Sequence, residues 1–304
     1  MEYKKFVCMV EEKLNLKLEG GMKASQYSVV KNNGMEKTGM ILESDEYNIA
    51  PAIYLEEFFE QYQKGMTIDK IVNEILEFYE KVKVEEDYDV SQLSLYENVK
   101  KKVAFKLVNT EKNQQMLKEV PYIPLLDLSI VFYILVDVDE KGSATIQIRN
   151  EHIENWDVNV EQLYKDAKLN VKCLIPARLM CMQHVIEKLC DISKAEEKDL
   201  LKAKFPPENK EFMYILTNSI HQFGAAVIAY PNILEMASRI IGEDFYLLPS
   251  SIHEVILVPE SFGLEPERMA EMVKEINQTG VAPEEVLSDS VYYFDGEEIR
   301  IVAK

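Results

Sequence analysis

A short polar stretch, Ser250-Ser251-Ile252-His253-Glu254, places hydroxyl, imidazole and carboxylate groups next to one another in the chain. These are the three kinds of side chain that a nucleophilic hydrolase uses, with a base that activates a serine and an acid that orients the base. The stretch follows Pro249 and precedes an apolar run, so we predict that it lies at the junction of two buried strands. Its residues are the first candidates for chemistry.

The spacing of these residues supports only part of a catalytic site. Residues two apart in a strand share a face, so Ser251 and His253 could meet, whereas Glu254 would point to the opposite side. A distant acid such as Asp244 or Asp289 could replace Glu254. However, the sequence has no Gly-x-Ser-x-Gly turn, which presents the nucleophile in one large hydrolase class. A hydrolase that uses Ser251 and His253 is therefore our alternative prediction.

A non-catalytic interpretation explains the same polar residues more simply. Ser250, Ser251 and His253 can satisfy backbone groups where two strands meet, while Pro249 fixes the direction of the chain. The polar residues at this edge of the C-terminal sheet would otherwise form a binding surface. Its predicted members are Thr217, Asn218, Ser250, Ser251, His253 and Glu254. We predict a non-catalytic module that binds a protein or peptide partner.

Metal and cofactor chemistry have little support in the sequence. Cys181 and His184 stand at i and i+3 of a predicted helix, a spacing compatible with two zinc ligands. With no further Cys/His pair nearby, we expect a surface cysteine beside a surface histidine and no metal site. His253-Glu254 begins a His-Glu-x-x-His pattern, but Leu257 occupies the position of the second histidine. The Walker A and dinucleotide-binding glycine patterns are missing, so we expect no cofactor.

Several strings in the last third of the chain resemble a known family. They are YILTN, GAAVIAYP and LPSSIHEV, followed by APEEVLSDSVYYFD. On these motifs the chain resembles a bacterial family of uncharacterised proteins, a domain-of-unknown-function family. The resemblance covers nearly the whole chain. It implies no activity, cofactor or site residue.

The composition is that of a soluble globular protein. The 304 residues are 47% hydrophobic, enough to bury a large core. The formal net charge is −19, with 34 basic against 53 acidic residues, which disfavours binding to nucleic acids and to anionic membranes. The longest apolar runs end well short of the roughly 20 residues that a membrane-spanning helix needs. We therefore expect neither a nucleic acid nor a membrane as a partner.

The cysteines and the first residues favour a cytoplasmic location. Cys8, Cys173, Cys181 and Cys190 form no CxxC pair, a pattern typical of reduced thiols rather than of a disulfide framework. The stretch MEYKKFVCMVEEKLNLKL carries acids and lacks a long apolar core, so it predicts an amphipathic helix and not an export signal.

Four apolar runs predict the strands that would position the candidate site. Met213–Leu216 and Ala225–Tyr230 are predicted to be neighbouring strands joined by a polar loop. Phe245–Leu248 and Val255–Val258 flank the polar stretch that holds Ser251 and His253.

Three further segments have the periodicity of helices. In the strongest, apolar residues from Ile68 to Tyr79 recur at helical spacing, with Thr67 as the N-cap. A second helix is predicted after Pro231 and ends at Gly242, a residue that tolerates the left-handed C-cap conformation. A third is predicted over Pro176–Leu189.

The order of these elements predicts an α+β protein of two lobes, with mixed or antiparallel sheets each flanked by helices. We place the N-terminal lobe at residues 1–170 and the C-terminal lobe at residues 171–304. The charged segment from about 194 to 210, which contains Pro206-Pro207, is the most linker-like part of the chain.

Overall fold

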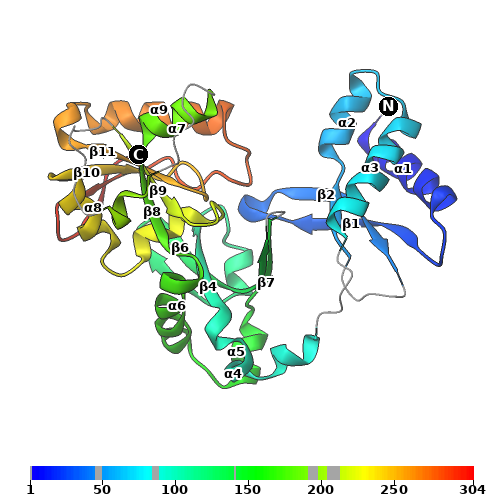
Figure 1. Cartoon of the computed structure of the whole chain (residues 1–304), viewed down its shortest axis with the longest axis horizontal. Helices are drawn as coiled ribbons and strands as arrows, with labels where there is room; N and C mark the ends of the chain where they lie inside the picture. Colours follow the sequence, from blue (N-terminus) through cyan, green and yellow to red (C-terminus); the bar gives the residue numbers. More distant parts are fainter. Residues whose placement is uncertain (1, 45–49, 84–88, 140–141, 191–197, 204–212) are drawn as a thin grey trace. The chain divides into compact units, whose positions relative to one another are not determined.

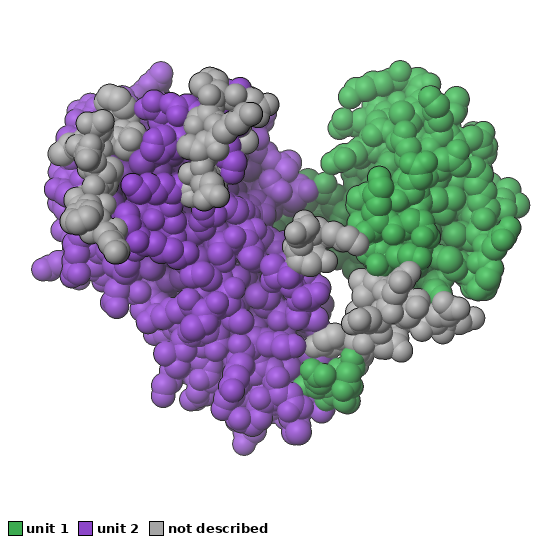
Figure 2. All heavy atoms as spheres, in the orientation of Figure 1, with its two compact units in different colours: residues 1–92 green, residues 93–304 purple. Residues whose placement is uncertain are grey.

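The computed structural model describes residues 2–44, 50–83, 89–139, 142–190, 198–203 and 213–304 (Figure 1). The fold is α+β, as predicted, and every paired strand in it is antiparallel. The chain divides into two compact units, Met1–Gln92 and Leu93–Lys304 (Figure 2).

Unit 1 packs helices against one three-stranded sheet. The strand order is β1-β2-β3, and a turn centred on Asn33, with its left-handed φ of 60°, joins the first two strands. One cluster of buried apolar side chains forms its core. The elements are α1 (Tyr3–Lys17), β1 (Lys23–Val30), η1 (Asn32–Gly34), β2 (Glu36–Glu43), β3 (Ala52–Tyr54), α2 (Glu56–Gln63), α3 (Ile68–Val82) and η2 (Val90–Ser94), the last of which runs across the boundary into unit 2.

Helix α3 confirms the strongest helix prediction. Its residues Ile68, Ile71, Val72, Ile75 and Tyr79 are buried. The Thr67 hydroxyl accepts a hydrogen bond from the backbone N–H of Lys70 at 3.4 Å, which satisfies one of the unpaired donors of the first turn.

Unit 2 contains a four-stranded sheet in which β6 is central. Strand β6 (Leu128–Asp139) pairs with each of the other three, in agreement with its apolar residues on both faces. Its partners are β4 (Val103–Asn109), β5 (Tyr122–Leu125) and β7 (Gly142–Gln147). The helices of this region are α4 (Tyr96–Val99), η3 (Lys100–Lys102), η4 (Met116–Lys118), α5 (Asn150–Trp156) and α6 (Val160–Leu174).

Unit 2 also contains a six-stranded sheet of order β13-β12-β10-β11-β9-β8. Helix α9 packs on one face and α8 lies on the other (Figure 1). The strands are β8 (Ala177–Cys181), β9 (Tyr214–Asn218), β10 (Phe245–Leu248), β11 (Val255–Pro259), β12 (Val291–Phe294) and β13 (Ile299–Ala303). The helices are α7 (Met182–Leu189), η5 (Leu200–Lys202), η6 (Gly224–Ala229), α8 (Ile233–Ile241), η7 (Glu260–Phe262) and α9 (Pro266–Thr279).

A single apolar core joins the two sheets of unit 2. It includes Phe132 of β6, Leu163 of α6 and Leu216 of β9, all fully buried. The sequence-based boundary between 170 and 171 falls within this core, whereas the structure divides the chain at 92 and 93. Of the linker-like segment from 194 to 210, residues 198–203 are described, and Leu200 among them is buried in the same core. The rest of that segment lies outside the described residues.

Two predicted elements differ from the structure. The run Ala225–Tyr230, predicted as a strand, forms the 3₁₀ helix η6, because a short continuous apolar run can be buried in either form. The predicted helix Pro176–Leu189 begins instead as strand β8, which pairs with β9, and becomes helical only at Met182. Within α7 the apolar side chain of Ile186 is 51% exposed, whereas Leu179 of β8 is buried.

Candidate functional site

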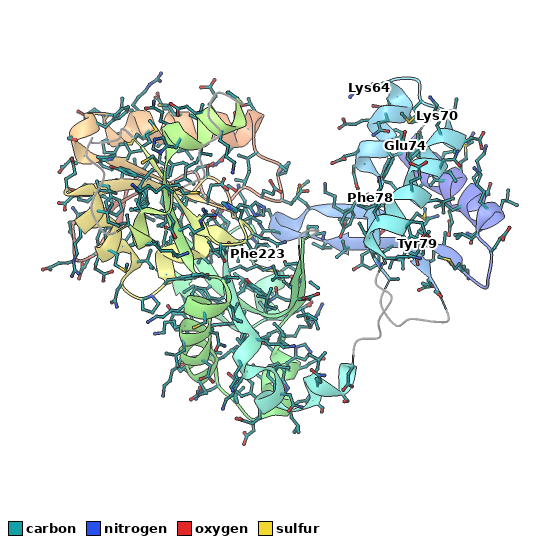
Figure 3. The ribbon with its side chains drawn as sticks, in the orientation of Figure 1. Lys64, Lys70, Glu74, Phe78, Tyr79 and Phe223 are labelled. Atoms are coloured by element: carbon teal, nitrogen blue, oxygen red, sulfur yellow. The ribbon has the colours of Figure 1, made fainter. Side chains whose placement is uncertain are left out.

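Two loops of unit 2 meet at the predicted site. Residues 219–223 connect β9 to η6, and residues 249–254 connect β10 to β11. The backbone N–H of Phe223 donates to Nδ1 of His253 at 3.4 Å, and the N–H of Ala225 donates to the Ile252 carbonyl at 3.2 Å. Figure 3 labels Phe223 at this junction. The polar stretch found in the sequence therefore does lie where two strands approach each other.

Thr217 and Asn218 brace this junction from the end of β9. Both are buried. The Thr217 hydroxyl donates to the His253 carbonyl at 2.7 Å. The Asn218 amide donates to the Gln222 carbonyl at 2.8 Å and accepts the N–H of Ile220 at 3.2 Å. These two predicted binding residues are therefore buried supports of the two loops, and their side chains are not presented at the surface.

The backbone of Gly224 lies very close to the end of β9 and to the loop that holds His253. A Cβ atom at this position would overlap the Thr217 hydroxyl oxygen and the His253 carbonyl oxygen, and would lie 2.9 Å from the Asn218 nitrogen. Only a residue without a side chain fits such an approach of two backbones.

Ser251 and His253 make contact through the histidine backbone and not through its ring. The Ser251 hydroxyl oxygen accepts the backbone N–H of His253 at 3.0 Å, and Ser251 is only 6% exposed. In the ring, Nδ1 faces the Phe223 N–H, and Nε2 lies 3.4 Å from Oε1 of Glu285. Both ring nitrogens are thus directed at groups other than the serine hydroxyl.

The other two predicted binding residues, Ser250 and Glu254, flank this pair. Both are partly exposed. The Ser250 carbonyl accepts the N–H of Leu287 at 2.9 Å. Glu254 adds a partly exposed carboxylate directly before β11.

The two most distinctive motifs of the sequence lie against each other in the structure. Backbone hydrogen bonds join Ser288 to Pro249 at 3.0 Å and Ile252 to Glu285 at 2.9 Å, and Ser251 forms an isolated β-bridge with Val286. LPSSIHEV and APEEVLSDSVYYFD therefore form one continuous structural unit, although more than 20 residues separate them in the chain.

Asp127 ties the second motif to the four-stranded sheet. It accepts hydrogen bonds from the Ser288 hydroxyl at 2.7 Å, from the Ser290 hydroxyl at 2.8 Å and from the Tyr292 phenol. Burial, followed by the negative charge of Asp127, raises the pKa of the Tyr292 phenol above its ordinary value. We call these four residues the Asp127 cluster. Sequence reasoning missed it because Asp127 lies about 160 residues from its partners.

Several basic side chains lie at the same junction, two of them against the Phe223 ring, and we call this group the basic corner. The Lys106 ammonium lies 4.7 Å from the centre of the Phe223 ring, and the His253 ring stacks on that ring at 6.2 Å with an interplanar angle of 11°. Nη1 of Arg178 lies 3.3 Å from Nε2 of His221. The members are Lys106, Arg178, His221, Phe223 and His253.

The sequence analysis identified only His253 among these residues. One available signal was the charged Lys106 inside the otherwise apolar run VAFKLV, since a lysine in such a strand must bring its ammonium to the surface. A second was Arg178 in the similar run ARLMC. Neither signal shows that the two residues lie at the same loop, because they belong to different sheets.

The two residues of the suggested Cys181 and His184 pair differ in their exposure to solvent. Cys181 ends β8 and is 3% exposed, so the expectation of a surface cysteine is wrong, whereas His184 is exposed on α7. Within the described ranges, no group of three or more histidine, cysteine or acidic side chains is placed to hold a metal ion. None of the described helices has both the length and the hydrophobicity that crossing a membrane requires.

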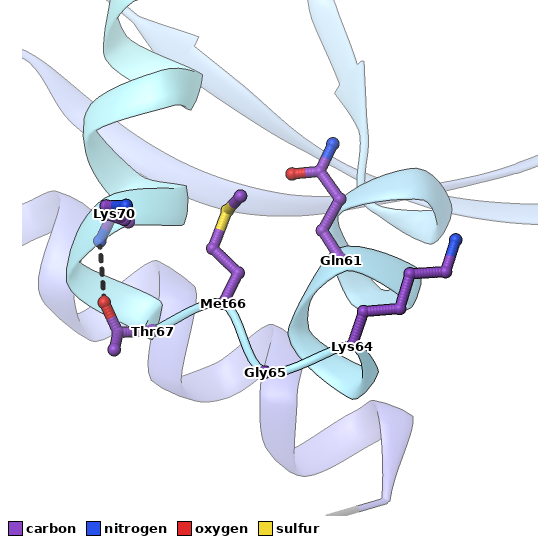
Figure 4. Close-up of a pocket in the computed structure, with 6 residues that line it drawn as sticks. All are labelled: Gln61, Lys64, Gly65, Met66, Thr67 and Lys70. Carbon is purple, nitrogen blue, oxygen red and sulfur yellow. Dashed lines mark hydrogen bonds between the residues drawn. The ribbon is translucent and has the colours of Figure 1, made fainter.

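Unit 1 carries a separate surface cavity of about 450 Å³ between the end of α2 and the start of α3 (Figure 4). One wall contains Lys64, which lies 3.8 Å from Glu60. None of the candidate site residues predicted from the sequence takes part in it. Its lining consists of Gln61, Lys64, Gly65, Met66, Thr67 and Lys70.

The family resemblance noted in the sequence is confirmed across nearly the whole chain. Residues 3–296 match the model of a family described as a family of unknown function, DUF5688. No curated protein and no solved structure matches the chain. The match includes both units and every residue of the basic corner, so the chain belongs to the DUF5688 family of unknown function.

Proposed function

We propose that this protein is a non-catalytic module that binds an acidic peptide segment of a partner protein at the basic corner. The observation that carries the proposal is that Lys106 and His253 lie against the Phe223 ring, with Arg178 beside His221 on the same loop, in a chain whose net charge is −19. Most of the surface of such a chain repels acidic segments, so a local group of cations is where one would be accepted.

The chemistry of the basic corner matches that of an acidic peptide. Lysine and arginine side chains donate charge-assisted hydrogen bonds to carboxylates, which are stronger than bonds between neutral groups. Phe223 is partly exposed and offers apolar contact area next to the cations. Aromatic and arginine side chains are the residue types that contribute most to the binding energy of protein interfaces.

The arrangement of Ser251 and His253 favours this proposal over hydrolysis. A nucleophilic serine needs a base within hydrogen-bonding reach of its hydroxyl. Here the serine hydroxyl accepts a backbone N–H, and the imidazole contacts Phe223 and Glu285. Both residues therefore stabilise the loop that presents the basic corner.

A bacterial, cytoplasmic location and a soluble state are part of the proposal. The cytoplasmic location is supported by the four cysteines, none of which is paired in a disulfide. Reducing compartments keep thiols in this form.

The test is to bind a fluorescein-labelled poly-glutamate peptide to the full chain at low salt, with fluorescence anisotropy as the readout. Because Lys106 and Arg178 supply two of the cations, Lys106→Glu and Arg178→Glu should each weaken binding by about tenfold, an energy of roughly 1.4 kcal/mol. Added salt should weaken binding in the same direction.

Two controls make this result specific. Lys274→Glu changes the same charge on the exposed face of α9 and should leave the affinity nearly unchanged. A poly-glutamine peptide of equal length should not bind. The proposal fails if wild type shows no affinity for poly-glutamate, or if Lys274→Glu weakens binding as much as the two corner variants do.

A further inference from the structure

The loop at the basic corner holds two residues in an unfavourable backbone conformation. His221 and Phe223 both have φ of 54°, in the left-handed region that side chains other than glycine rarely adopt. Such residues persist only where their surroundings hold them in place. The contacts made by Phe223 therefore help to keep the 219–223 loop in this shape, together with the hydrogen bonds of Asn218 to Ile220 and Gln222.

The His253 ring makes two of the contacts that hold Phe223, beside the Tyr133 ring and the N–H of Ala226, which donates to the Phe223 carbonyl at 3.2 Å. Its Nδ1 accepts the Phe223 N–H, and its plane stacks on the Phe223 ring. The backbone of His253 is fixed separately, because its N–H donates to Ser251 and its carbonyl accepts the Thr217 hydroxyl. The imidazole is thus attached to a fixed backbone, and its protonation state and tautomer decide whether Nδ1 can accept a hydrogen bond.

A neutral imidazole with its proton on Nε2 fits this geometry, since Nε2 then faces Oε1 of Glu285 and Nδ1 remains an acceptor. A second proton would go to Nδ1 and turn that acceptor into a donor. Nδ1–H and the Phe223 N–H would then oppose each other, and the hydrogen bond would be lost. The ring is 25% exposed, so protons from the solvent can reach it.

The charged groups around the ring act in both directions. Glu285, on the turn that contacts Nε2, and the adjacent Glu254 favour the protonated ring. Lys106 of β4 lies on the same Phe223 ring and opposes it. Histidine is the side chain whose charge ordinarily changes between about pH 5 and pH 8.

We propose that His253 is a proton-operated latch of the 219–223 loop: the neutral ring holds Phe223 in its left-handed conformation, and the protonated ring releases it. The use of the latch rests on the proposed binding function, because release changes how the basic corner presents Phe223 and adds a positive charge beside it. An acidic segment would then be bound more tightly at low pH. The latch itself needs no partner.

The latch can be tested on the full chain by NMR, with hydrogen exchange of the Phe223 amide measured at several pH values and corrected for the intrinsic exchange rate. Protection of this amide should fall by about tenfold or more as the His253 ring protons titrate. In His253→Gln, which cannot titrate, protection should no longer depend on pH. His221→Gln is the matched control, in which the fall should remain.

Equal protection of the Phe223 amide above and below the titration of His253 would overturn the latch, as would a fall that persists in His253→Gln. If His253→Gln does not fold, the wild-type protein still tests the proposal. Protection of its Phe223 amide either changes over the same pH range as the His253 ring resonances or stays constant. The single tryptophan, Trp156 on α5, shows by its fluorescence whether the rest of unit 2 remains folded. Since no peptide is used, failure of the latch is distinct from failure of the binding proposal.

Discussion

At the scale of single residues, Ser251 and His253 show how the same side chains can serve a fold or a reaction. Their types are those of a nucleophile and its base, but their hydrogen bonds go to the backbone and to neighbouring loops. Sequence spacing predicted their proximity, since residues two apart are close in any extended segment. It could not predict which atoms meet, because that depends on Phe223 and Glu285, which are distant in the sequence.

If these residues are structural, Ser251→Ala and His253→Ala should each lower the free energy of unfolding by about 1–3 kcal/mol, the cost of leaving a buried polar group without its partner. Denaturant unfolding of each variant measures this loss. Wild type should also remain unlabelled by a fluorophosphonate probe, which reacts with a serine that a base has activated.

The opposite pattern would contradict the structural role of the pair. It consists of specific labelling at Ser251 that disappears in His253→Ala while both proteins unfold at the same denaturant concentration. A hydrolase would then be the better account.

Gly224 gives a second prediction at this scale. In Gly224→Ala the added methyl group would overlap the Thr217 hydroxyl and the His253 carbonyl, so the two loops must separate. We expect a loss of about 1–3 kcal/mol or more in the free energy of unfolding, typical of overpacking a buried site. Gly280→Ala is the control, since its methyl would meet nothing closer than 3.4 Å. Equal stability of the two variants would show that the loops are not packed as described.

At the scale of elements, the sequence predicted best where local and tertiary signals agree. The α3 helix has a strong apolar stripe and a capping threonine, and both were found in place. The η6 segment has neither signal, because Ala225-Ala226-Val227-Ile228 is apolar on every side and fits a buried strand or helix equally well. The basic corner was missed for a related reason: its members come from β4, β8 and two loops, and no local pattern connects them.

The hydrogen bonds and burial of the Asp127 cluster predict a loss of stability at high pH. Burial and the Asp127 charge raise the pKa of Tyr292 in the folded chain. Above about pH 10, the ordinary pKa of tyrosine, the unfolded chain loses this proton and the folded chain keeps it, so stability falls as the pH rises. Tyr292→Phe should reduce this fall by about 1.4 kcal/mol per pH unit, the contribution of one proton.

Urea unfolding of wild type and Tyr292→Phe from neutral pH to above pH 10 measures this difference. Tyr122→Phe is the matched control, because Tyr122 is 41% exposed and should make no such contribution. Parallel pH profiles for wild type and Tyr292→Phe would contradict the buried role of Tyr292.

At the scale of the whole molecule, the chain has two units that each possess an apolar core. The sequence predicted two lobes but placed the division at 170 and 171. The difference has a physical origin: the two sheets of unit 2 share one core, and that sharing depends on long-range contacts such as those between β4 and η6.

Separate cores predict separate responses to a mutation. Ile75 is fully buried in unit 1, so Ile75→Asp would bury a carboxylate without a partner and should destabilise that unit by several kcal/mol, about 3–5 by analogy with other unpaired buried charges. The fluorescence transition of Trp156, in unit 2, should stay where it is in wild type. A shift of the Trp156 transition equal to the loss of helical circular dichroism would show that the two units unfold together.

The most direct test of the central claim is to locate the bound peptide. A poly-glutamate peptide titrated into ¹⁵N-labelled protein should shift the backbone amides of Lys106, Arg178, His221, Phe223 and His253, and the shifts should saturate together with a single dissociation constant. The amide resonances of Lys64 and Lys70, which line the unit 1 cavity, should not shift. Saturable shifts confined to that cavity, or no shifts at the basic corner at any peptide concentration, would contradict the account.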